Sequence, residues 1–326
     1  MTIRSYLKKA AIMFSVLGLI LAPQVIFAQS TSDNGAVIPR LANGKPDIQG
    51  TWDFRTITPM QRPVSLGDKA VLTEAEAAVF EAEENVRRDR DNFTDTSRTG
   101  DYNQFWYDRG TELIGDRRTS LITVPVNGRI PPITEAARAK QVQRREAREL
   151  SYGIEARPLA ERCIMGFNSG PPMIPSAYNN NVQLVQTDGH LLIHNEMVHN
   201  VRIVKLDETT HREFPRKWEG DSIGYWEGDT LVVETDYFLR DTSFRNSSEN
   251  MQLTERFTLE NADTLTYEFT IEDPTTWTEP WTAKIPMKRA DLPIYEYACH
   301  EGNYSMAGVL GGWRRLEYNA MVEGSD

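Results

Sequence analysis

Hydrophobic and polar residues alternate along much of the chain after about residue 181. In "DTLTYEFTIED", residues 263–273, the apolar side chains fall on one face, and mainly threonine and glutamate fall on the other. A period of two is typical of a strand with one buried face. Short turns such as "EGD" at 227–229 separate neighbouring runs, which indicates β-hairpins.

The same alternation predicts about nine or ten short strands, with no helix between most of them. The expected strands are "DIQGTWDFR", "VQLVQTDGHLLIHNEM", "HNVRIVKL", "IGYWEGDTLVVETDYF", "MQLTERFTLE", "DTLTYEFTIED", "PWTAKIPMKR" and a closing "WRRLEY". Consecutive hairpins form an antiparallel meander, and a meander of this size closes into a barrel or a sandwich. We therefore expect a single, mainly β domain over residues 47–326.

Between about residues 72 and 151 the pattern becomes helical. "LTEAEAAVFEAEENVRR" contains Thr73 followed by Glu76, which is the spacing of a capping box. "PITEAARAKQVQRREARELS" is a second run of good helix formers. Both runs carry charge on most faces, so we expect two surface helices, joined by a loop, that embellish the β domain near its N-terminal side.

The start of the chain predicts export. Residues 1–28 have a basic start, an apolar run, Pro23 and a small residue at Ala28, which is the layout of a signal peptide. An uncleaved membrane anchor is the alternative, but it needs about 20 unbroken apolar residues, and Pro23 interrupts the run. Residues 29–46 are polar and predict a flexible tail. We expect a periplasmic or secreted protein that leaves the membrane after cleavage.

The charge of the chain limits its partners. The whole sequence carries a net charge of −11, and the signal peptide holds three of the 36 basic residues and no acidic ones, so the mature chain carries −14. A surface this acidic repels phosphate backbones and anionic membranes. We expect a small-molecule partner and no nucleic acid.

The sequence contains two cysteines, Cys163 and Cys299. In an oxidising compartment an isolated pair usually forms a disulfide, and we expect one here. Two buried, reduced thiols are the alternative. Neither cysteine has the C-x-x-C spacing of a zinc site.

Two resemblances add to this pattern. "GTW" at 50–52 and the late arginines Arg314 and Arg315 resemble lipocalin-like barrels, in which the tryptophan of a Gly-x-Trp motif packs under an arginine from the far end of the chain. The resemblance implies that the meander closes into a lipocalin-like barrel, with Trp52 next to one of these arginines.

Several longer runs resemble an uncharacterised family of exported bacterial proteins. They are "ERCIMGFNSGPPMIPSAYNNNVQLVQT", "EMVHNVRIV", "GDSIGYWEGDTLVVET", "ERFTLENADTLTYEFTIEDPTTWTEPW" and "YEYACHEGNYSMAGVL". The resemblance implies that five residues belong to a common pattern: Glu196, His199, Arg202, Asp221 and His300. It supplies no reaction, and His194 departs from the pattern.

The run "HNEMVHN", residues 194–200, offers acid–base chemistry. A carboxylate beside an imidazole raises the histidine pKa and orients the ring. A turn or bulge within this run can bring Glu196, His199 and Arg202 together in an interior pocket. The alternative is an Arg–Glu pair on the barrel rim.

The second cluster is "YACHEGN", residues 297–303, in which His300 and Glu301 follow the second cysteine. A disulfide fixes this run beside "ERCIMGFNSGPP", so the stapled loop can form a pocket floor. The alternative is a helix start in "EGNYSMAGVL", with Glu301 placed by the helix dipole. His194, Glu196 and His300 are the residues that could ligate a metal, but no helical H-E-x-x-H motif is present and we expect none.

The function expected from these clusters is acid–base catalysis on a small, partly apolar molecule by an exported lyase, isomerase or hydrolase. The catalytic candidates are Glu196, His199, Arg202, His300 and Glu301. The ligand-binding candidates are Tyr178, Asn180, Asp221, Trp226, Tyr267 and Trp277. No nucleotide loop, flavin motif or haem motif is present, so we expect no organic cofactor. The alternative is a non-catalytic lipocalin-like ligand carrier, with the tryptophans packed in the core or lining the ligand site.

Overall fold

The computed structural model describes residues 30–31, 37–92, 103–150, 153–206, 208–240, 244–245, 247 and 249–323. The predicted signal peptide, residues 1–28, lies outside the described residues. Of the helices that the structure describes, none is long and apolar enough to cross a membrane.

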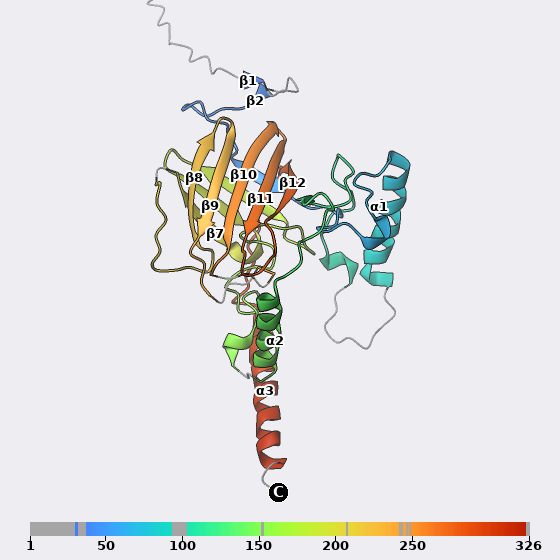
Figure 1. Ribbon diagram of the computed structural model, residues 1–326, viewed down its shortest axis with the longest axis vertical. Helices are drawn as coiled ribbons and strands as arrows, with labels where there is room; N and C mark the ends of the chain where they lie inside the picture. The colour runs from blue at the N-terminus through green and yellow to red at the C-terminus, as the bar shows by residue number, and fades with distance from the viewer. Residues whose placement is uncertain are drawn as a thin grey trace, which may run out of the picture.

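Nine of the described strands close into a barrel (Figure 1). In order around the barrel they are β3 (Gly50–Asp53), β5 (Asn181–Gln186), β6 (His190–Asn195), β7 (Val201–Lys205), β8 (Asp221–Glu227), β9 (Thr230–Asp236), β10 (Gln252–Asn261), β11 (Thr264–Glu272) and β12 (Trp281–Ala290). Pairing of β12 with β3 closes the barrel. Two further pairings involve short strands: β4 (Ile122–Val124) pairs with β12, and β1 (Ser30–Thr31) pairs with β2 (Val37–Ile38). The prediction of a mainly β chain closed into a barrel is confirmed.

One pair of neighbouring barrel strands departs from the antiparallel meander. β7 and β8 run parallel, with Lys205 opposite Ile223, whereas the other barrel pairs are antiparallel. A parallel neighbour needs a connection that returns the chain to the end where the first strand began. Residues 206–220 therefore come back toward the end of the barrel at which β5 and β7 begin.

The barrel interior is filled with side chains. Trp52, Phe257, Phe269 and Trp281 are each less than 2% exposed. Along β10 and β11 every second residue is buried, as the alternation predicts. Full burial of one large apolar side chain stabilises a fold by about 1.5–3 kcal/mol, so this interior is a packed core.

The tryptophan of the Gly-x-Trp motif packs under an arginine of β12. The guanidinium carbon of Arg289 lies 4.3 Å from the ring centroid of Trp52. Gly50 has a φ of 118°, and a Cβ atom there would collide with the Arg289 guanidinium, so this position needs glycine. The predicted contact of Trp52 with Arg314 or Arg315 is wrong, because both arginines lie on the C-terminal helix.

Three α-helices are described: α1 (Glu74–Arg88), α2 (Glu135–Leu150) and α3 (Tyr304–Glu323). The capping box of α1 is formed, since Glu76 N donates to Thr73 Oγ1 at 3.3 Å and Thr73 N donates to Glu76 Oε2 at 2.9 Å. Where the structure describes the predicted loop, residues 89–92 and 103–111, it contains the short 3₁₀ helices η2 (Arg90–Asn92) and η3 (Gln104–Trp106), and β4 follows further along the chain.

The expected closing strand "WRRLEY" lies within α3, so that prediction is wrong. Leucine, arginine and glutamate are strong helix formers, and one alternation over six residues does not outweigh them. No residue of α3 is buried. Figure 1 shows α2 and α3 extending from the end of the barrel that lies away from β1 and β2.

Short 3₁₀ helices punctuate the connections: η1 (Val64–Leu66), η2 (Arg90–Asn92), η3 (Gln104–Trp106), η4 (Ile154–Ala156) and η5 (Met197–His199). Residues 37–46, which the sequence assigns to a flexible tail, lie against the barrel. Ile38 is 2% exposed, Arg40 forms an ion pair with Asp229, and Asn43 donates to Asp188 at 2.9 Å.

Candidate functional site

A fully buried cluster of ionisable side chains lies inside the barrel. Arg202 on β7 makes two contacts with the carboxylate of Glu255 on β10, one of them 2.8 Å from Nη2 to Oε1. Tyr267 on β11 donates its hydroxyl to Glu255 Oε1 at 2.7 Å. All three residues are at most 5% exposed. The backbone N–H of Met173 donates to the Tyr267 hydroxyl at 3.1 Å, so the 168–180 segment reaches this cluster.

The strand pattern places these polar groups on the inward face. Leu253, Glu255 and Phe257 are the buried positions in the first half of β10, and Phe257 lies opposite Tyr267 on β11. Glu255 lies two residues before Phe257 on β10 and therefore faces the barrel interior, as Tyr267 does on β11. A buried carboxylate without a partner costs several kcal/mol, so these protein partners replace its water.

Two members of the interior cluster, Tyr267 and Arg202, have shifted pKa values. Burial raises the pKa of the Tyr267 hydroxyl well above its usual value, and the charge of Glu255 raises it further. Burial lowers the pKa of Arg202, but the charge and hydrogen bonds of Glu255 outweigh burial, and the net shift is upward. Tyr267 therefore remains a hydrogen-bond donor, and Arg202 remains charged.

Glu219 lies beside this cluster, in the connection between β7 and β8. Burial raises the pKa of its carboxyl group, while the charge of Arg202 and a hydrogen bond with Asn200 oppose the rise. A carboxyl group with a raised pKa exchanges a proton closer to neutral pH than an ordinary glutamate does. The alternation of hydrophobic and polar residues gave no sign of Glu219, because this residue lies in a connection between strands.

The run "HNEMVHN" forms the turn between β6 and β7. Asn195 N donates to Asn200 O at 2.8 Å, and this bond closes the turn around η5. Val198 and His199 have φ values of 62° and 48°. A positive φ is strained for a β-branched residue such as valine, so the surrounding contacts must hold this turn in place.

The turn separates the side chains that were expected to converge. Glu196 is 6% exposed and accepts a hydrogen bond from Asn181 Nδ2 at 2.8 Å. His199 Nε2 accepts from the backbone N–H of Tyr297 at 2.7 Å. Because that nitrogen accepts, it carries no proton, and Nδ1 of the neutral ring is the donor. Glu196 and His199 thus flank the same turn, whereas Arg202 points into the barrel and pairs with Glu255.

The disulfide between Cys163 and Cys299 is confirmed, with the two Cα atoms 5.7 Å apart. Asn303 Nδ2 donates to Glu161 O at 2.8 Å and adds a second link between the two segments. Tyr297, two residues before Cys299, contacts His199, so the disulfide lies at the end of the barrel where β7 begins. We call this end the disulfide end.

The stapled segments border a cavity of about 610 Å³. Its lining includes Arg157, Glu161, Glu296, Tyr297 and Asn303. His300 and Glu301, two catalytic candidates, are exposed. They lie in the turn that precedes α3, which starts at Tyr304. Neither of them lines this cavity.

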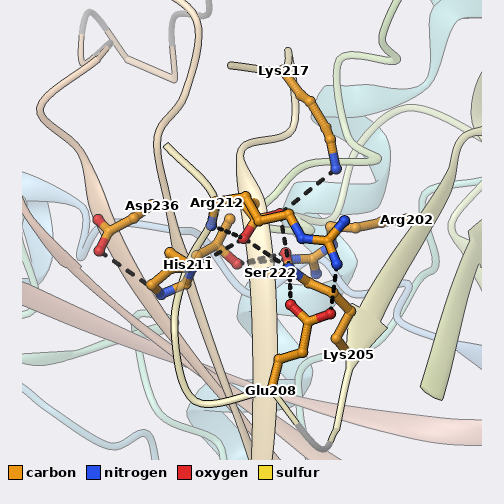
Figure 2. A network of polar contacts seen from close by, with 10 residues as sticks. Arg202, Lys205, Glu208, His211, Arg212, Lys217, Ser222 and Asp236 are labelled. Atoms are coloured by element: carbon orange, nitrogen blue, oxygen red, sulfur yellow. Dashed lines mark hydrogen bonds and ion pairs between the residues drawn. The ribbon is translucent and has the colours of Figure 1, made fainter. Parts of the chain in front are cut away.

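Asp221, at the start of β8, forms ion pairs with Lys205 and Lys217. Figure 2 shows these two lysines with His211 and Arg212 in one network of polar contacts. Lys205 Nζ lies 3.0 Å from Asp221 Oδ2, and the backbone N–H of Arg212 donates to the same oxygen at 2.9 Å. His211 Nδ1 lies 3.5 Å from that oxygen. Burial raises the pKa of Asp221, but the hydrogen bonds from Arg212 and Lys205 outweigh it, and the net shift is downward. These partners fix the 206–220 connection over the barrel.

The other ligand-binding candidates are dispersed. Asn180 is fully buried, and its side chain bonds to the backbone of residues 108 and 176. Tyr178 is half-buried and packs edge-on against a neighbouring phenylalanine ring. Trp277 lies in the core with its ring centroid 5.7 Å from that of Trp281, and Trp226 is half-buried at the edge of the core. The structure does not bring these residues together with Glu196 and His199.

No protein-family model and no curated protein matches the chain. The class that the fold defines is a closed β-barrel with a helical insertion, and its likeness to lipocalin-like barrels rests on the fold. The resemblance to a family of exported bacterial proteins stays a prediction. Within the described part of the chain, no group of three or more histidine, cysteine, aspartate or glutamate residues is placed to hold a metal ion.

Proposed function

We propose that the protein is an exported enzyme that uses a carboxyl group as acid or base, aided by a hydrogen bond from an imidazole, on a small, partly apolar molecule. One observation carries this proposal. Ionisable groups from separate parts of the chain lie at the disulfide end: Glu196 and His199 flank one turn, and Glu219 lies beside Arg202 and Asn200. A ligand carrier needs few such groups, whereas a catalyst needs several.

The structure supports different roles for these groups. Glu219 fits the role of general acid or base, because burial raises the pKa of its carboxyl group. The charge of Arg202 lies close to this carboxyl group and limits the rise. His199 fits a hydrogen-bond donor through Nδ1, since the backbone of Tyr297 occupies Nε2. Glu196 accepts a hydrogen bond from the side chain of Asn181, which holds the carboxylate of Glu196 in place. Arg202 is a positioning residue, because Glu255 holds its guanidinium inside the barrel.

The experiment compares purified wild-type protein with three variants, Glu219→Gln, Glu196→Gln and His199→Ala, in an untargeted metabolite-depletion assay. Loss of a general acid or base lowers turnover by about 10²-fold or more, so Glu219→Gln should abolish depletion. Glu213→Gln is the matched control, because Glu213 is an exposed carboxylate in the same connection. Turnover that survives in all three variants contradicts the proposal.

A non-catalytic ligand-binding protein is the second candidate. The 610 Å³ cavity at the disulfide end favours it, because its lining contains the disulfide and polar groups but neither Glu196 nor His199. The same assay separates the two functions. A carrier retains at most a stoichiometric amount of one metabolite and releases it unchanged on denaturation, whereas an enzyme depletes many equivalents and yields a product.

A further inference from the structure

The disulfide between Cys163 and Cys299 forms part of the wall of the 610 Å³ cavity at the disulfide end, since both cysteines line it. Cys163 is 5% exposed, whereas Cys299 is half-buried. A thiol reduces a disulfide by direct attack of its thiolate on one sulfur atom, so the reaction needs access to that atom. The cavity offers a small thiol this access from the side of Cys299.

The side chain of Asn303 links the buried half of the disulfide to the segment that follows Cys299. Its Nδ2 donates to Cys163 Sγ at 3.5 Å and to the backbone oxygen of Glu161 at 2.8 Å. A hydrogen bond to the charged form of a group favours that form, so this donor stabilises a thiolate at Cys163. A better stabilised thiolate leaves faster in disulfide exchange. Cys163 is therefore the better leaving group, and Cys299 is the sulfur that is attacked.

The segment that carries Cys299, residues 291–303, has few bonds to the rest of the molecule. Most of its residues are exposed, and Tyr295 is 65% exposed. In the described part of the chain, two of its residues form hydrogen bonds to other segments. Tyr297 N donates to His199 Nε2 at 2.7 Å, and Asn303 makes the two bonds given above. A segment with few buried contacts opens locally, so the disulfide is the main restraint on this one.

We propose that this disulfide is a redox latch that controls access to His199. One thiolate of a small dithiol enters the cavity and attacks Cys299 Sγ, the S–S bond breaks, and Cys163 leaves as a thiolate. The second thiolate of the dithiol then displaces Cys299, so the protein gains two thiols and the dithiol becomes its cyclic disulfide. In the oxidised protein the backbone N–H of Tyr297 occupies His199 Nε2. In the reduced protein the 291–303 segment detaches, and Nε2 is free to accept a hydrogen bond from a ligand.

Treatment of the full mature chain with dithiothreitol at pH 8, where thiolates are more abundant, tests the latch. Iodoacetamide trapping with intact mass counts the thiols, and amide hydrogen exchange is measured on the same samples. We expect two alkylated thiols while β10 and β11 stay protected, with exchange at Tyr297 at least tenfold faster than in the oxidised protein. Reduction that occurs only when β10 and β11 also exchange needs global unfolding and overturns the latch. Exchange at Tyr297 that reduction leaves unchanged overturns it too. Neither readout involves catalysis, so the latch and the proposed function can fail separately.

A matched pair of variants tests access through the cavity. Ser305 and Ala307 are both exposed positions near the start of α3, but Ser305 lines the cavity and Ala307 does not. Ser305→Phe places a ring in the path of the thiol and should slow reduction at least tenfold, whereas Ala307→Phe should change the rate less than threefold. Equal rates in the two variants overturn access through the cavity.

Near-ultraviolet circular dichroism of the oxidised variants confirms that each is folded. If Ser305→Phe is not folded, wild-type protein is treated with 2-mercaptoethanol, quenched with acid and mapped for the mixed disulfide. A mixed disulfide on Cys299 supports the attack described above, and one on Cys163 overturns it.

Discussion

Arg202 inside the barrel and Arg109 in a cavity of about 310 Å³ on the helical side of the molecule both lie near a tyrosine, but their charges are balanced in different ways. Inside the barrel, Arg202 is neutralised by the bidentate carboxylate of Glu255, and Tyr267 completes the hydrogen bonds of that carboxylate. In the second cavity, which we call the arginine cavity, the guanidinium of Arg109 lies over the ring of Tyr107, and its Nε has no hydrogen-bond partner among the described residues. The fold supplies a counter-charge for Arg202 but only an aromatic ring for Arg109.

The difference shows which arginine the fold depends on. A buried, neutralised pair such as Arg202 with Glu255 loses much stability if one partner is removed. Arg109 carries a charge that burial and the neighbouring arginines disfavour, so removing it should cost little. Stability measurements should therefore separate the two regions clearly.

The largest effect is expected inside the barrel. Glu255→Gln leaves the charge of Arg202 buried without a counter-charge, and breaking a buried ion pair in this way costs about 3–5 kcal/mol. Urea denaturation of the variant should show this loss. The double variant Arg202→Met/Glu255→Leu replaces both charges with apolar side chains and should recover most of the stability. If the single variant is as stable as wild type, the pair is not a structural unit.

The disulfide should follow in magnitude. Replacing Cys163 and Cys299 by serine releases a cross-link between residues 136 positions apart, and removing a disulfide typically costs about 2–4 kcal/mol. The loss should be accompanied by faster amide exchange at Tyr297, because its N–H bonds to His199 only while the stapled segment stays in place. Unchanged exchange at Tyr297 would show that the disulfide does not hold this contact.

The alternation of residues predicted the strands and the closure of the barrel well, because burial of one face repeats every second residue. It predicted the inward face of Arg202 and Tyr267 but not their common partner. Glu255 lies 53 residues after Arg202 in the sequence, and only the strand register determines which inward residues meet. The Gly-x-Trp resemblance correctly expected an arginine over Trp52, but the wrong strand at "WRRLEY" shifted the choice away from Arg289.

The arginine cavity could not be predicted from the same pattern. Arg88 ends the surface helix α1, Arg90 begins η2, and Arg109 lies further along the chain, so nothing in the sequence shows that they line one cavity. Three basic residues at 87, 88 and 90 in an acidic chain were the available signal. The turn at "HNEMVHN" was predicted, whereas the contact of His199 with Tyr297 depends on the disulfide and the tertiary fold.

Acid should weaken the connection between β7 and β8 through Asp221. The pKa of Asp221 is lowered in the folded protein, so the group contributes stability above its unfolded pKa, and this contribution is lost as the pH falls through the folded pKa. Asp221→Asn should cost about 1.5–3 kcal/mol at pH 7, typical of a hydrogen bond to a charged group. The difference between wild type and variant should narrow below about pH 4, the ordinary range of aspartate. Thermal unfolding at pH 7 and pH 3 measures it, and a difference that grows toward acid contradicts the sign.

The smallest effect, and of opposite sign, is expected in the arginine cavity. Arg109→Gln removes a charge that burial and the neighbouring arginines disfavour. The variant should therefore be as stable as wild type or more stable by about 0.5 kcal/mol, the scale of a surface charge interaction. Thermal unfolding measures this, with Arg87→Gln as the reference. A clear loss of stability in Arg109→Gln would show that Arg109 is already compensated within the protein, and the contrast with Arg202 would disappear.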